Sequence, residues 1–257
     1  MNLNQFAIKT AQPLLNTEIV ETQWVALPPI LEQRDIAAFL DLETAKIDAL
    51  VAEQRRLIDL LREKRQAVIS HAVTKGLNPK AQLKPSGIDW LGDVQEGWAT
   101  IQLRYLCNLL KDGTHLPPPR VEEGVPLLSV RNLQNGKFTT LDDDSLISEA
   151  DFQGLCRAFV PEKGDVLLAV VGATLGKSAI VDETLPRFHI QRSLAIFRPT
   201  SSVSAEWLNL VFQSKNFQQL LWSKVGFSAQ PGIYLGVLSE IRFPKIAIQE
   251  QREIVTT

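Results

Sequence analysis

The feature that most constrains this chain is an internal repeat at an offset of 218 residues. Ala11-Gln12-Pro13 recurs as Ala229-Gln230-Pro231, and Glu32-Gln33-Arg34 recurs as Glu250-Gln251-Arg252. Chemically similar residues match at the same offset: Ile19/Val237, Val20/Leu238, Ile30/Ile248, Asp35/Glu253, Ile36/Ile254 and Ala37/Val255. Because these matches share one offset, we expect one period of a two-period protein. Residues 1–29 are then a remnant tail of a preceding copy, and residues 246–257 are the truncated start of a second long helix.

Residues 30–76 are predicted to form the first long helix. Pro28-Pro29 stands just before it, where proline is tolerated, and Gly76 follows its last turn. Seven apolar residues occupy the alternating four-three positions of a coiled-coil seam: Ile36, Leu40, Ile47, Leu50, Leu57, Leu61 and Val68. A seam of this length needs another long helix, so we expect a homodimer formed through it. A helix laid along its own globular domain is the alternative.

The remaining sequence predicts a mixed fold. Residues 77–98 form a polar connector, in which Trp90 and Trp98 are expected to dock on the core. Residues 99–245 contain short apolar runs separated by turn residues, which indicates a mainly-β domain, while residues 205–225 have helical spacing. The expected fold class is therefore α+β: a mainly-β domain with a few helices, plus one long coiled-coil-type helix.

Composition argues against several functional classes. With 27 basic and 29 acidic residues the formal net charge is -2, so the overall basic character usual for DNA-binding domains is lacking, although a local basic face stays open. Two cysteines and three widely separated histidines provide neither a disulfide framework nor a metal site. There is no run of about 18 apolar residues and no signal-peptide pattern, so we expect a cytoplasmic protein without membrane contact.

A glycine-rich loop from Gly172 to Ser178 is similar to a nucleotide-binding loop but differs from it in two ways. A P-loop has four residues between its glycines, whereas three separate Gly172 from Gly176. The residues from Ser178 onward also indicate a strand instead of a helix. A nucleotide hydrolase is therefore disfavoured. Two interpretations stay open: an ordinary hairpin, or a loop whose Thr174, Lys177 and Ser178 hold a DNA phosphate.

Polar side chains near predicted strand ends form a second group of candidates. Residues 111–115 form a loop stiffened by the prolines that follow, and its histidine has no nucleophile at triad spacing, so a surface or DNA-contact loop is favoured. Arg131-Asn132 and Gln191-Arg192 carry side chains that hydrogen-bond base edges in the major groove, but these types are also common on surfaces. Asn135-Gly136 predicts a hairpin, and Asp142-Asp143-Asp144 predicts a solvated turn.

Several segments resemble the specificity subunits of type I restriction-modification enzymes. Three resemble the conserved helical spacer of that family: LPPILEQRDIA at 27–37, EKRQAVISHAVTKGL at 63–77 and SGIDWLG at 86–92. Three others resemble its target recognition domain: DGTH at 112–115, GDVLL at 164–168 and GATLGK at 172–177. The resemblance covers nearly the whole chain, and its spacer motifs are the more specific ones.

The resemblance implies a non-catalytic DNA-recognition subunit with no cofactor or metal of its own. In this family each recognition domain reads one half of a split target in double-stranded DNA. The long helices dock methyltransferase subunits, which bind S-adenosylmethionine, and the restriction subunit joins outside them. Residues 99–245 are then the recognition domain. Its predicted DNA contacts are Lys111, Thr114, His115, Arg131, Asn132, Thr174, Lys177, Ser178, Gln191, Arg192 and Gln230.

Two functional hypotheses follow. The first is a half-length specificity subunit that reads half of a split target, docks methyltransferase subunits through its long helix and pairs with itself. The second is a truncated product that acts only as a protein-interaction module and does not bind DNA.

Overall fold

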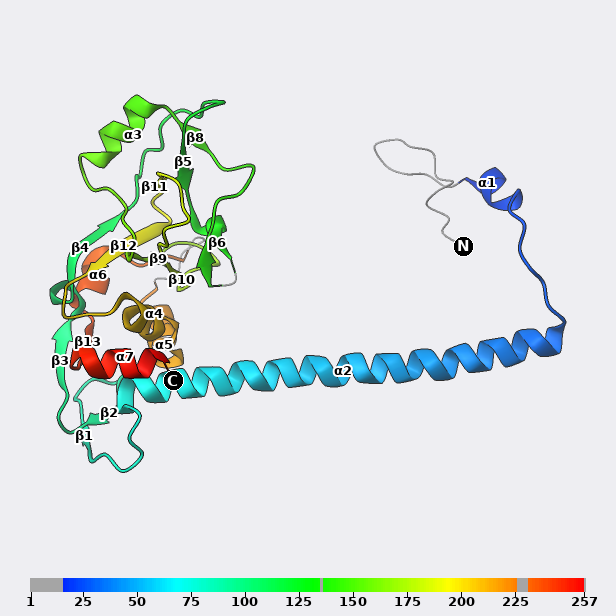
Figure 1. Cartoon of the computed structure of the whole chain (residues 1–257), viewed down its shortest axis with the longest axis horizontal. Coiled ribbons are helices and arrows are strands. Elements are labelled where there is room, and N and C mark those ends of the chain that lie inside the picture. Colours follow the sequence, from blue (N-terminus) through cyan, green and yellow to red (C-terminus); the bar gives the residue numbers. More distant parts are fainter. Residues whose placement is uncertain (1–15, 135, 226–230, 257) are drawn as a thin grey trace. The chain divides into compact units, whose positions relative to one another are not determined.

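The computed structural model describes residues 16–134, 136–225 and 231–256 (Figure 1). The chain divides into two compact units, Met1–Leu60 and Leu61–Thr257. The first unit contains α1 (Thr17–Glu21) and most of α2 (Ile30–Lys75), and the second unit contains the end of α2 and all later elements. Each unit is described by itself below.

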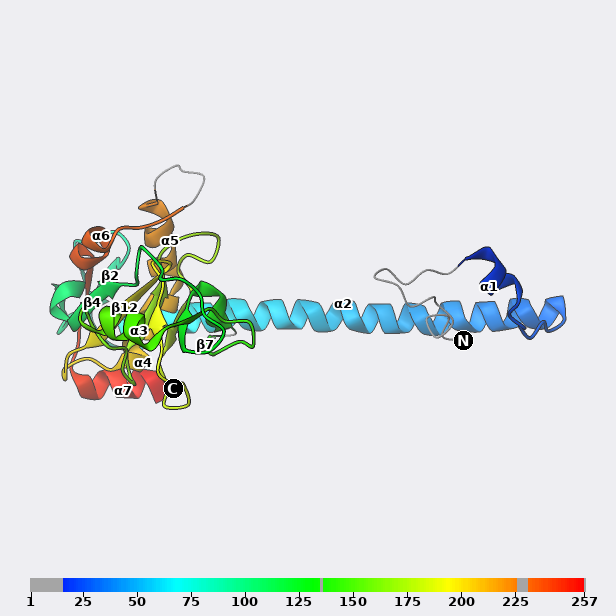
Figure 2. The same ribbon diagram turned by 90° about the horizontal axis from the view of Figure 1, so that it is seen from above.

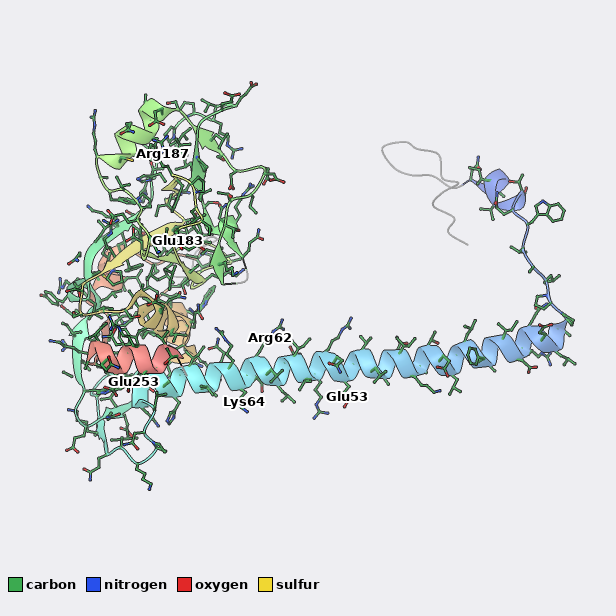
Figure 3. All side chains as sticks on the ribbon, viewed as in Figure 1. Glu53, Arg62, Lys64, Glu183, Arg187 and Glu253 are labelled. Carbon is green, nitrogen blue, oxygen red and sulfur yellow. The ribbon has the colours of Figure 1, made fainter. Side chains whose placement is uncertain are left out.

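The long helix α2 confirms the predicted helix almost residue for residue. It begins at Ile30, directly after the two prolines, and ends at Lys75, and Gly76 adopts the left-handed conformation (φ 76°) that commonly terminates a helix. The seven seam residues are all 44–59% exposed, so no described residue covers the seam. Figure 3 shows charged side chains, among them Glu53, Arg62 and Lys64, projecting from different sides of the helix. Pairing of the seam with a second helix stays a prediction.

The last turns of α2 belong to the core of the second unit. Ile69, Ala72 and Val73 are buried together with Trp90 and Trp98, which confirms that these tryptophans dock the connector. The helix α7 (Ile248–Thr256) lies beside this end of α2 in both views (Figures 1 and 2). The connector also contains a small antiparallel pair, β1 (Leu83–Pro85) with β2 (Asp93–Gln95).

A four-stranded antiparallel sheet forms the centre of the second unit, in the order β10-β9-β12-β4. Its strands are β10 (Ser178–Ile180), β9 (Val166–Ala169), β12 (Leu194–Pro199) and β4 (Cys107–Asp112). Every residue of β9 is buried, because both faces of the sheet carry a core. One core is rich in aromatic rings, including Trp90, Phe217 and Phe243, whose ring centroids lie 5.5–5.9 Å apart.

Smaller sheets surround this centre. A three-stranded sheet has the order β11-β5-β8, in which β11 pairs with β5 in parallel and β8 pairs with β5 antiparallel. Two further antiparallel pairs are β13 with β3 and β6 with β7. The strands of these sheets are β3 (Ala99–Gln102), β5 (Val125–Leu128), β6 (Leu133–Gln134), β7 (Lys137–Phe138), β8 (Leu146–Ile147), β11 (His189–Ile190) and β13 (Arg242–Lys245). The predicted α+β class is therefore confirmed.

Short helices connect the strands, and serine caps begin three of them. The helices are α3 (Glu149–Cys156), α4 (Ala205–Gln213), α5 (Lys215–Ser223) and α6 (Leu235–Glu240), with 3₁₀ turns η2 (Leu103–Tyr105) and η3 (Val130–Asn132). The stretch 205–225 forms two helices instead of one. Ser214 ends α4 and caps α5, since its extended backbone (ψ 142°) breaks the helix and its hydroxyl accepts from the Phe217 amide. In the part of the chain that the structure describes, no helix is long and apolar enough to cross a membrane.

Candidate nucleic-acid interface

Three of the predicted contact segments meet at one end of the four-stranded sheet. In the register of the sheet, Leu194 pairs with Ala169, Ala195 with Asp112, and Ser178 with Leu168. The start of β12, the ends of β9 and β4 and the start of β10 therefore share one edge. Residues 111–115, 170–178 and 191–193, which directly flank these strand ends, come together there although they are far apart in the sequence.

Backbone hydrogen bonds join two of these loops directly. The Thr114 amide donates to the Ile190 carbonyl at 2.9 Å, and the Arg192 amide donates to the Thr114 carbonyl at 3.0 Å. Gly113 sits so close to the carbonyl oxygens of Ile190 and Gln191 that a Cβ atom at this position would overlap them. Glycine is therefore required here by close backbone approach.

The loop after β4 presents a lysine and a histidine to solvent. Lys111 is exposed, and His115 Nε2 lies 2.6 Å from the Asp112 carboxylate. The Thr114 hydroxyl donates to the Leu116 carbonyl, which bends the loop back on itself. The Asp112 carboxylate fixes the position of the imidazole. This arrangement suits a positioned surface contact better than proton transfer, since no described residue forms a nucleophile beside the histidine.

Arg131 and Asn132 lie in the 3₁₀ turn η3 after β5, not at the strand end itself. Asn132 is buried, and its amide group bonds to the Ser129 amide, the Thr139 carbonyl and the Asp144 carboxylate. It supports the loop and has no group left for a base. The half-exposed Arg131 forms an ion pair with Asp143 and a longer one of 3.4 Å with Asp144.

The prediction of a solvated turn is therefore wrong for Asp144 but not for the exposed Asp142 and Asp143. The Asp144 side chain is only 5% exposed, because it accepts from the Leu141 amide and from Asn132. The predicted hairpin in this region is confirmed, since Leu133 pairs with Phe138 and Gln134 with Lys137. Asn135 itself lies outside the described residues.

Gln191 and Arg192 precede β12 and differ in their hydrogen bonding. The Gln191 amide group donates to the Leu127 carbonyl at 3.3 Å, and its backbone amide donates to Leu128, so the residue ties the loop to β5. The exposed Arg192 guanidinium makes no hydrogen bond or ion pair with any described residue. Arg192 is therefore available for an external acceptor.

The glycine-rich segment is the connection of a hairpin between β9 and β10. Gly172 and Gly176 have positive φ values of 87° and 90°, and the Leu175 amide donates to Gly172. The connection leads into strand β10 and not into a helix, which agrees with the rejection of a P-loop. Lys177 is exposed and makes no bond to a described residue.

Two hydroxyls at this hairpin lack hydrogen-bond partners. Thr174 Oγ1 and Ser178 Oγ are buried and bond to no described residue. Buried polar atoms without partners are uncommon in folded proteins. They are consistent with a site that an external acceptor or donor completes.

An open groove with a volume of about 920 Å³ runs beside this hairpin. Its positive charge comes from Arg65 of α2, Lys137 of β7 and Lys177, and its lining contains one carboxylate, Glu206 of α4. Gln66 Oε1, Ser178 Oγ and Asn209 Oδ1 line it and have no described partner. Sequence reasoning missed Arg65, Lys137 and Asn209, because only the β6–β7 hairpin and the packing of α2 and α4 place them here. The remaining predicted contact, Gln230, lies outside the described residues.

Among the residues that the structure describes, neither an activated cysteine nor a metal site accompanies these loops. Burial raises the pKa of the half-buried Cys107 thiol to about 12, with Asp165 adding to the shift, so this thiol stays protonated at neutral pH. Burial also raises the pKa of the Cys156 thiol and lowers the pKa of His189. Both cysteines are free and half-buried. Among the described residues, no group of His, Cys, Asp and Glu side chains is arranged to hold a metal ion.

Comparison with known proteins gives the relatives of this chain. No protein-family model matches the chain. The specificity subunit of the type I restriction enzyme MjaVIII of Methanocaldococcus jannaschii is 24% identical over 247 residues, which cover 95% of this chain and 56% of the relative. The EcoBI specificity subunit of Escherichia coli is 26% identical over 249 residues, which cover 94% of this chain and 52% of the relative.

This chain is a homologue of type I specificity subunits. It spans about half the length of the curated relatives that it matches. A solved chain from a study of complex assembly and conformational transition of the type I R-M system has the same fold, with a TM-score of 0.61 and 22% identity over 96% of this chain and 56% of that chain. Specificity subunits are non-catalytic, in agreement with the prediction that this chain is not an enzyme.

Proposed function

We propose that this specificity-subunit homologue reads one half of a split DNA target through the loops at the end of its four-stranded sheet. The observation that carries the proposal is the convergence of Lys111, Lys177 and Arg192 at one sheet edge, beside a groove that also contains Arg65 and Lys137. Exposed cations in one groove supply the local basic face that the net charge of -2 conceals.

The predicted contacts take different roles in this proposal. Lys111, His115, Lys177 and Ser178 are the proposed phosphate contacts, since hydroxyls and polar or cationic side chains commonly bind phosphates. Arg192 and, after release from Asp143, Arg131 are suited to guanine edges in the major groove. Asn132 and Gln191 hold the loops that carry these side chains. We expect the domain to work in the cytoplasm.

The long helix α2 is the proposed docking element for protein partners. Its exposed seam continues over more than four heptads, which is far more than a solvated helix requires. A second copy pairs with this seam, and methyltransferase subunits bind the remaining faces of the helix. The restriction subunit joins through the methyltransferase subunits. Any S-adenosylmethionine is bound by them and not by this chain.

A salt titration of DNA binding by the purified chain tests the recognition proposal. Phosphate contacts release counterions, so the logarithm of the binding constant should fall linearly and steeply with the logarithm of salt concentration. A chain that binds methyltransferase subunits but shows no salt-dependent DNA binding would instead be a protein-interaction module. Methylation mapping in cells that contain the chain and its methyltransferase then gives the target.

Light scattering at micromolar concentration tests self-pairing separately. A dimer that reads two equal halves should give a symmetric footprint on DNA. A strict monomer, or a footprint on a single isolated half-site, would rule out the symmetric arrangement. Either result would leave the proposal that the loops read DNA unchanged.

A further inference from the structure

The described residues before and at the start of α2 repeat the last elements of the second unit. At the offset of 218, α1 (Thr17–Glu21) falls on α6 (Leu235–Glu240), and the first residue of α2, Ile30, falls on the first residue of α7, Ile248. Residues 24–27, between α1 and α2, fall on the strand β13. The three elements α6, β13 and α7, residues 235–255, are called the closing segment below, and residues 17–37 are called its N-terminal counterpart.

One side-chain hydrogen bond is repeated at the same offset. Gln33 Nε2 donates to the Pro28 carbonyl at 2.7 Å, and Gln251 Nε2 donates to the Ile246 carbonyl at 3.0 Å. The two segments therefore adopt the same turn into a helix. Gln251 also accepts from the Ser204 amide at 2.7 Å and donates to the Ser202 carbonyl at 2.9 Å, which fixes the closing segment to the domain.

Burial is the property that differs between the two segments. In the closing segment, Leu238, Phe243 and Ile254 are 0–5% exposed. Their counterparts are apolar too, but Val20, Val25 and Ile36 are 49%, 74% and 44% exposed. The counterpart of β13 has no strand partner among the described residues, while β13 itself pairs with β3. The N-terminal counterpart thus keeps the apolar positions that fit the domain without any described residue covering them.

We propose that the N-terminal counterpart binds the domain of a second copy in place of that copy's closing segment. Val25 would then occupy the position of Phe243 beside β3, and Gln33 the position of Gln251 beside Ser204. The proposal rests on the self-pairing proposed above: the exposed seam and the counterpart belong to one continuous stretch, so a second copy covers both. Exchange of equivalent segments between copies is a common route to dimers.

The burial of β13 provides a matched pair of substitutions. Phe243 is buried and Lys245 is exposed, so their counterparts Val25 and Leu27 should be buried and exposed respectively in the exchanged segment. Both counterparts are more than 70% exposed in the single chain, so neither substitution should disturb its folding. Val25→Asp should weaken self-association about tenfold or more, because it buries a carboxylate, whereas Leu27→Asp should change it less than about twofold.

The outcomes separate this inference from the proposed function. Equal dissociation constants for the two variants and the unaltered dimer would overturn segment exchange and leave pairing through the seam intact. A monomeric unaltered chain would overturn both exchange and self-pairing, while DNA reading is decided independently by the salt titration.

A disulfide test examines the register of the exchange directly. Two full-length chains are mixed, both with Cys107 and Cys156 replaced by alanine. One carries Leu27→Cys and the other Ala99→Cys. These positions are chosen because Lys245, the counterpart of Leu27, pairs with Ala99. The mixture should form a cross-chain disulfide under mild oxidation. Leu27→Cys mixed with Gln102→Cys, three residues along β3, should form it much more slowly. No cross-chain disulfide in either mixture, or equal rates in both mixtures, would overturn the exchange.

Discussion

The indole Nε1 of Trp98 donates to both carboxylate oxygens of Glu250, at 3.2 and 3.1 Å. The two residues are 152 positions apart, and their bond joins the connector after α2 to the start of α7. Trp98 is 4% exposed, so this bond is largely shielded from water.

Removal of the indole donor should destabilise the second unit. Trp98→Phe keeps most of the apolar ring but leaves the Glu250 carboxylate without its donor, so we expect the free energy of unfolding to fall by about 1–3 kcal/mol. Chemical denaturation measures this loss. Glu250→Gln retains an acceptor oxygen and is the control, and an equal loss in both variants would contradict the role assigned to the bond.

Gly113 should tolerate no side chain. A Cβ atom at this position would overlap the carbonyl oxygens of Ile190 and Gln191, which are backbone atoms that cannot move independently. Gly113→Ala should therefore lower the thermal unfolding midpoint and separate the loop from β11. Gly154→Ala in α3 is the control, since it meets no atom within 4 Å and should stabilise the helix by about 0.5–1 kcal/mol. If both variants unfolded alike, the close approach would be incorrect.

Two exposed cations should affect DNA binding in different ways. Lys177→Ala should weaken binding to all DNA sequences and reduce the salt slope by about one, as expected of a phosphate contact. Arg192→Ala should cost about 1–3 kcal/mol on the mapped target and relax sequence preference. Lys84→Ala on β1 is the charge-matched control. Loss of affinity in the control equal to that in Lys177→Ala would indicate a general charge effect and not a defined interface.

The pH dependence of stability should reflect His189. Burial lowers its pKa below the usual value of 6.5, so the unfolded chain binds a proton at a higher pH than the folded chain does. The unfolding free energy should therefore decrease as pH falls below about 6.5 and level off below the lowered pKa. His189→Gln should show a smaller decrease between pH 7 and pH 5 in urea denaturation. An identical decrease in both proteins would contradict this origin.

Periodicity predicted the elements that depend on local sequence. The bounds of α2 follow from the two prolines before Ile30 and from Gly76 after Lys75, and all three act through local backbone geometry. The division between α4 and α5 was not predicted, because Ser214 fits a helical surface position as well as a cap. Its role depends on its extended backbone.

The sequence predicted individual residues of the candidate interface, but not that these residues lie together at one end of the four-stranded sheet. Lys111, Lys177 and Arg192 were chosen for their chemistry, and only the register of β4, β9 and β12 brings them to one edge. Asn132 shows the opposite case. Its side chain has the chemistry of a base contact, yet the turn η3 and Asp144 bury it. Long-range pairing of this kind leaves no local signal in the sequence.

Backbone hydrogen bonds, together with the side chains of Asn132 and Gln191, hold the loops of the candidate interface. Bonds such as those from Thr114 to Ile190 and from Arg192 to Thr114 use amide and carbonyl groups that nearly every residue type possesses. Mutation at positions 111, 177 or 192 can therefore alter surface chemistry without loosening the loops. If these loops read DNA as proposed, such a scaffold would let sequence preference diverge during evolution at little cost in stability, and new targets could arise from point substitutions instead of from a rebuilt domain.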